Sequence, residues 1–82
     1  MPAREVTLGE RESAAVRATL VLEDTARAWL RARARGDSRG IQHYEQQLEV
    51  ALVDSRRASS ALEKTRRRLA RRAELTTTEE DR

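Results

Sequence analysis

The chain of 82 residues contains no cysteine, no phenylalanine, one proline and three glycines. Without cysteine it can form no disulfide, thiolate metal site or cysteine nucleophile. One tryptophan and one tyrosine leave few aromatic rings for a large core or for stacking on nucleic-acid bases,. No apolar run approaches the roughly 20 residues of a membrane span, and no signal peptide follows Met1,. These absences favour a soluble, cytoplasmic protein.

Alanine, leucine, arginine and glutamate dominate the composition, which is typical of long helices and coiled coils,. Charged residues make up 38% of the chain, yet the net charge is only +3, so the placement of the charges carries more information than their total. At this length the chain forms one domain at most, and such a domain buries only about 60–65% of its unfolded surface. We therefore expect association with a second copy or with a partner.

The segment Gly36-Asp37-Ser38-Arg39-Gly40 is the one glycine-rich interruption between two long segments with helical character. Gly36 suits the end of a first helix, and Asp37 or Ser38 can cap a second. Thr7 followed by Glu10 fits a capping box at the start of the first helix. The sequence predicts a flexible arm over 1–6, a helical hairpin over 7–75 and a disordered acidic tail over 76–82. Within the hairpin, helices over about 7–35 and 41–75 flank a bend at 36–40.

Both helices carry a heptad pattern that defines one contact seam each. The fold predicted from this pattern is all-α, an antiparallel, coiled-coil-like two-helix hairpin. Basic residues late in the second helix would lie beside Glu5, Glu10 and Glu12, and this charge match favours the antiparallel register,. Near the bend, arginines at 27–35 would face Glu45 and Glu49. The predicted seam consists of Leu8, Ala15, Ala18, Leu22, Thr25, Trp29 and Ala32, and of Ile41, Tyr44, Leu48, Ala51, Ser55, Ala58, Leu62, Thr65 and Leu69.

Several large apolar residues lie off this seam, near the middle of both helices. Folding joins them into one belt, which two helices alone cannot enclose, and such a patch normally marks an interface. The alternative is that they thicken the intrachain core. Trp29 is expected to pack between the helices opposite Leu48, or else to anchor a partner. The predicted protein interface comprises Val16, Leu20, Val21, Trp29, Leu30, Val50, Leu52 and Val53.

Catalytic and metal chemistry find no support in the residue pattern. His43 is the one histidine, and a metal site needs three or four converging ligands,. Ser55, Ser59 and Ser60 have no histidine placed to activate them,. Glu23 and Asp24 are neighbours on a helix and point about 100° apart, so they form no carboxylate dyad. We expect no enzyme activity, no cofactor and no bound metal.

A basic ridge is predicted on the second helix, formed by Arg57, Lys64, Arg67 and Arg71. Such a ridge can neutralise phosphates. It can equally be a solvated, ion-paired face, or a surface for an acidic protein or a membrane.

The sequence thus favours a small non-enzymatic interaction or assembly module. In this interpretation it is a homodimer that forms a four-helix bundle through the apolar belt, or it docks on a protein partner. The first alternative is a nucleic-acid-binding protein that uses the basic ridge. The second is an inhibitor that docks on a larger protein.

Overall fold

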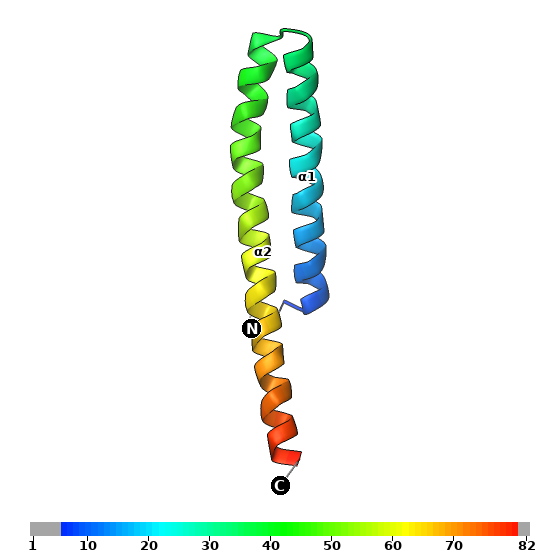
Figure 1. Cartoon of the computed structure of the whole chain (residues 1–82), viewed down its shortest axis with the longest axis vertical. Coiled ribbons are helices and arrows are strands. Elements are labelled where there is room, and N and C mark those ends of the chain that lie inside the picture. The colour runs from blue at the N-terminus through cyan, green and yellow to red at the C-terminus, as the bar shows by residue number, and fades with distance from the viewer. Residues whose placement is uncertain (1–5, 81–82) are drawn as a thin grey trace, which may run out of the picture.

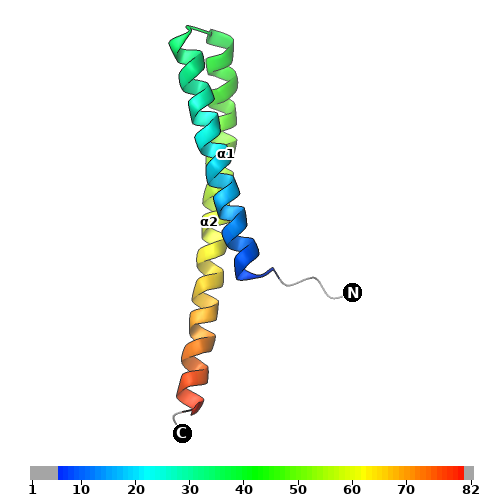
Figure 2. The same ribbon diagram turned by 90° about the vertical axis from the view of Figure 1, so that its right-hand side faces the viewer.

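The computed structural model describes residues 6–80, and the side chains of residues 6–75. Within this range the chain forms two helices, α1 over Leu8–Ala34 and α2 over Ser38–Glu80, joined by a short connection. Figure 1 shows the helices side by side and antiparallel, with α2 continuing well beyond the start of α1; Figure 2 shows the same arrangement after a quarter turn. The long axis of the molecule measures 68 Å. The predicted all-α hairpin is confirmed.

The bend is tighter than predicted, because both of its helix ends are capped by local hydrogen bonds. Gly36 adopts φ 68°, which a residue with a Cβ adopts only under strain,. The N–H of Gly36 donates to the carbonyl of Arg33, and the N–H of Asp37 donates to the carbonyl of Ala32, which together form a Schellman motif,. The Asp37 carboxylate accepts from the N–H of Gly40 at 3.0 Å. Asp37 therefore caps α2, which begins at Ser38 rather than at residue 41.

The other helix ends also follow local chemistry. The Thr7 hydroxyl accepts from the N–H of Glu10 at 3.2 Å, so α1 begins within one residue of the predicted start. No glycine or proline follows Gly40, and α2 continues to Glu80 rather than ending near 75,. The helix thus includes most of the predicted 76–82 tail. Residues 1–5 of the predicted arm and residues 81–82 of the tail lie outside the described residues.

The predicted seam is the contact between the helices. Its members on α1, and those on α2 from Ile41 to Thr65, are all buried or partly buried. Ala32, Ala51 and Thr65 are the most buried, at 0%, 4% and 6% exposed, and no large side chain among the described residues is fully buried. The Thr65 hydroxyl donates to the carbonyl of Ala61 at 3.0 Å, so its burial leaves no hydroxyl hydrogen unpaired,. This seam is thin, and it hides little apolar surface.

The seam ends earlier on α2 than its heptads suggest. Leu69 was predicted as a seam residue, but its side chain is 38% exposed. The contacts at the bend explain this, since Ala32 meets Gly40 there and Leu8 is then level with about residue 65. Residues 66–80, roughly 22 Å of helix at 1.5 Å per residue, project past α1 without a partner helix (Figure 1).

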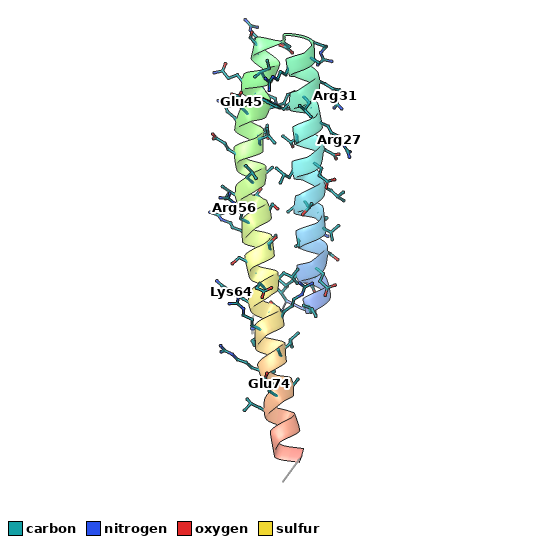
Figure 3. All side chains as sticks on the ribbon, in the orientation of Figure 1. Arg27, Arg31, Glu45, Arg56, Lys64 and Glu74 are labelled. Carbon is teal, nitrogen blue, oxygen red and sulfur yellow. The ribbon has the colours of Figure 1, made fainter. Side chains whose placement is uncertain are left out.

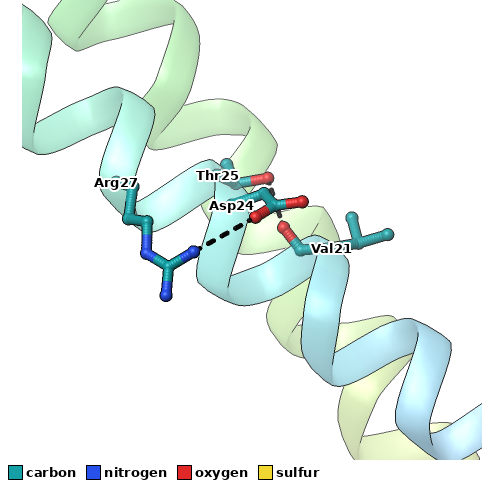
Figure 4. Close-up of polar contacts among 4 residues, drawn as sticks. All are labelled: Val21, Asp24, Thr25 and Arg27. Atoms are coloured by element: carbon teal, nitrogen blue, oxygen red, sulfur yellow. Dashed lines mark hydrogen bonds and ion pairs between the residues drawn. The ribbon is translucent and has the colours of Figure 1, made fainter.

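The expected ion pairs between the helices near the bend do not form. Neither Glu45 nor Glu49 has an ion-pair partner within residues 6–80. Figure 3 shows Glu45 on α2 and the side chains of Arg27 and Arg31 on α1 pointing away from one another. Arg27 instead pairs with Asp24 of its own helix at 3.6 Å (Figure 4). Exposed pairs of this kind contribute little, so the seam and the bend set the register.

Candidate functional site

The apolar belt lies on the surface of the hairpin. Its seven off-seam members are 42–59% exposed, and the alternative that they thicken the intrachain core is therefore wrong. Each is large and aliphatic, and all lie in the middle portion of the two helices. They are Val16, Leu20, Val21 and Leu30 on α1 and Val50, Leu52 and Val53 on α2.

Trp29 differs from the other predicted interface residues. Its side chain is partly buried in the seam, and its indole Nε1 is buried without a hydrogen-bond acceptor within the described part of the chain. The guanidinium of Arg33, one turn later, lies 5.3 Å from the centroid of the ring, in a cation–π arrangement,. Trp29 therefore contributes to intrachain packing. Its contact with Leu48 stays a prediction.

The belt divides between two flanks of the hairpin, a distinction that the sequence analysis missed. At about 100° per residue, Val21 lies about 140° around α1 from Val16, and Leu52 lies about 160° around α2 from Val50. An antiparallel pair has a local two-fold axis normal to the plane of its helices, so equivalent heptad positions fall on the same flank. We name the two groups the leucine flank (Val16, Leu20, Leu30, Leu52) and the valine flank (Val21, Val50, Val53).

The leucine flank is continuous with the seam. Thr19 and Ala26 lie between it and the seam residues of α1, so the apolar face of this helix is wider than one seam requires,. Mid-helix polar side chains do not interrupt the apolar face, because they bond within α1: the Thr25 hydroxyl donates to the carbonyl of Val21 at 2.7 Å (Figure 4). The face is therefore suited to packing against another helix.

The predicted basic ridge is exposed along its length, at Arg57, Lys64, Arg67 and Arg71. Arg67 is partly neutralised, because its Nε lies 3.4 Å from the Glu63 carboxylate of the previous turn. The heptad positions of Arg57 and Lys64 place them on the same side as the valine flank. The ridge and the leucine flank are thus separate surfaces.

A groove beside the ridge brings in a residue that the sequence analysis missed. Arg11 occupies the seam position one heptad before Ala18, and this spacing was the signal that could have identified it. Its side chain is partly buried, and its Nε is buried with no hydrogen-bond partner within residues 6–80. We name the cavity of about 570 Å³ around it the basic groove, which is lined by Arg11, Arg57, Ser60, Ala61, Lys64, Thr65 and Arg68.

Other chemistry has little basis in the described residues. His43 is exposed and makes an edge-on contact with Tyr44, with ring centroids 5.0 Å apart. No group of three or more histidine, aspartate or glutamate side chains in residues 6–75 is arranged to hold a metal ion. Neither helix, over its described residues, is long and apolar enough to cross a membrane.

The fold and its surface define a small, extended helical hairpin with much exposed apolar area, a form consistent with self-association or with docking on a partner. Comparisons with protein-family models, with curated protein sequences and with solved structures find no match for this chain.

Proposed function

We propose that this protein is a non-enzymatic assembly module, in which two hairpins associate through the leucine flank and form a four-helix bundle. One observation carries the proposal: the exposed aliphatic side chains of the leucine flank extend a seam that buries no large side chain of its own. A long, thin hairpin of this kind is marginally stable alone. Covering the leucine flank supplies the apolar burial that the hairpin lacks.

A second copy suits this flank because its charges are of both signs. The heptad positions next to the leucine flank hold Glu12, Glu23, Arg33, Glu45, Glu49, Arg56, Glu63 and Arg66. Such a surface can pair with itself under two-fold symmetry, with acids of one copy beside bases of the other. The opposite flank is mostly basic, and it would repel its own copy. Self-association through the leucine flank therefore leaves the basic groove facing outward.

The size of the effect follows from the exposed fractions. Burying a whole leucine side chain contributes about 2 kcal/mol, and about half of Leu20 (53%) and Leu52 (42%) is still exposed,. Each leucine then contributes about 1 kcal/mol on association, and a symmetric dimer counts each twice. The total of about 4 kcal/mol corresponds to about a thousandfold in the dissociation constant.

The test replaces both residues with glutamate, L20E together with L52E, and measures molar mass by sedimentation equilibrium. We expect a dimer for the native chain and a monomer of retained helicity for the variant. The matched control, V21E with V50E, adds the same charge on the valine flank and should remain dimeric. A native chain that is monomeric at high concentration, or equal dissociation of both variants, would contradict the proposal. In the first case a different protein becomes the candidate occupant.

A further inference from the structure

We propose that the basic groove binds the phosphate backbone of a nucleic-acid duplex, independently of base sequence. The groove combines one cation from α1 with three from α2, namely Arg11, Arg57, Lys64 and Arg68, and no carboxylate lines it. None of these four residues has an ion-pair partner within the described part of the chain. Four converging cations without a counter-ion form a site for a highly charged anion.

Arg11 gives the groove its second wall. It projects from the seam position near the start of α1, where other heptads place alanine or threonine. A buried donor normally has an acceptor, so the buried Nε of Arg11 without one calls for an explanation,. A phosphate oxygen in the groove would accept from the Arg11 guanidinium, which is suited to bidentate contacts with phosphate.

The groove extends along α2 rather than closing on a single small anion. An adjoining cavity shares Lys64 and Arg68 with it and is also lined by Arg67, Arg71, Arg72 and Leu75. From Arg57 to Arg71 the cations follow the helix for roughly 21 Å at 1.5 Å per residue. Toward the bend the row ends, because Glu49 and Asp54 line the next cavity together with Arg57. A row of this length requires a ligand with regularly repeated negative charges.

The geometry favours a duplex over the other polyanions. A membrane surface is planar, whereas these cations line a groove and continue along one straight helix. Single strands are usually held by aromatic side chains that stack on the bases, and no aromatic residue lines either cavity,. A duplex presents closely spaced phosphates along a rigid axis. In the proposed dimer two such grooves face outward, but the proposal applies equally to a single hairpin.

The test titrates the full chain into a fluorescently labelled 20-base-pair DNA of arbitrary sequence, from 50 to 200 mM salt, and follows anisotropy. The variant K64Q with R68Q removes two groove cations, and R11Q is tested separately. The control, R56Q with R66Q, removes the same charge from the opposite flank of α2. We expect the groove variant to lose roughly tenfold per phosphate contact at 50 mM salt, and its salt slope to fall by about 2. The control should keep the native slope, and R11Q should lower it by about 1.

Competition separates the duplex from other anions. Unlabelled duplex should displace the label at much lower concentration than single-stranded DNA, poly-glutamate or anionic phospholipid vesicles. Absence of binding at 50 mM salt would overturn the proposal. So would equal losses in the groove and control variants, or displacement by poly-glutamate or vesicles as efficient as by duplex. Sedimentation of K64Q with R68Q should still report the native assembly, so failure here is distinguishable from failure of the dimer.

Discussion

Replacing Gly40 with alanine tests the register on which both surfaces depend. Gly40 lies in the first turn of α2 at the closest approach of the two helices. A Cβ there would lie 3.1 Å from the Cβ of Ala32 and 2.5 Å from the Asp37 carboxylate oxygen Oδ2. Ala32 is 0% exposed and has little freedom to move aside. The substitution therefore pushes the helix ends apart or displaces the Asp37 cap.

The sign of the effect follows from three opposing contributions. Alanine has a higher helix propensity than glycine, which stabilises α2 by about 1 kcal/mol. Loss of the Asp37 cap costs about 1 kcal/mol. Overpacking against Ala32 costs about 1–3 kcal/mol. We expect G40A to lower the free energy of unfolding by about 2 kcal/mol.

The matched control is G9A, because a Cβ on Gly9 meets only the Thr7 hydroxyl oxygen, at 4.0 Å. This substitution should raise the stability, by up to about 1 kcal/mol. Urea unfolding is followed by helical circular dichroism and by the fluorescence of Trp29, at one fixed protein concentration because association adds to the measured stability. If G40A proves as stable as the native chain, or more so, the close contact at the bend is refuted.

Three further predictions concern the caps and the projecting end of α2. T7A should lower the stability by about 1 kcal/mol in thermal unfolding, while T7S should retain the native value, because the serine hydroxyl can replace the cap of α1,. G36A should cost about 1–2 kcal/mol in urea unfolding, since φ 68° is unfavourable for alanine, and G36N should cost less,. Removal of residues 73–82 should lower the helical signal in proportion to the length removed and leave the urea midpoint unchanged, because α1 does not reach this segment; a lower midpoint would show a packing role.

The sequence predicted the fold because local signals agreed along the chain. Glycine and aspartate at the bend, threonine before α1 and a regular heptad on α2 all require only neighbouring residues to be interpreted. The same periodicity separated seam residues from belt residues, and the exposure of Leu20 and Val50 follows that separation. The end of α2 was less predictable, because its last turns contain no strong stop signal.

The sequence by itself determined that this chain folds back once into two helices, and that its middle carries more apolar surface than two helices can hide. Only the tertiary structure decided which residues share a flank and which lie level with one another. Those relations depend on the register of α1 against α2, which the contact between Gly40 and Ala32 fixes and which composition cannot encode. Arg11 shows the consequence: an arginine beside several others in the sequence statistics becomes, once that register is set, the second wall of a basic groove with α2.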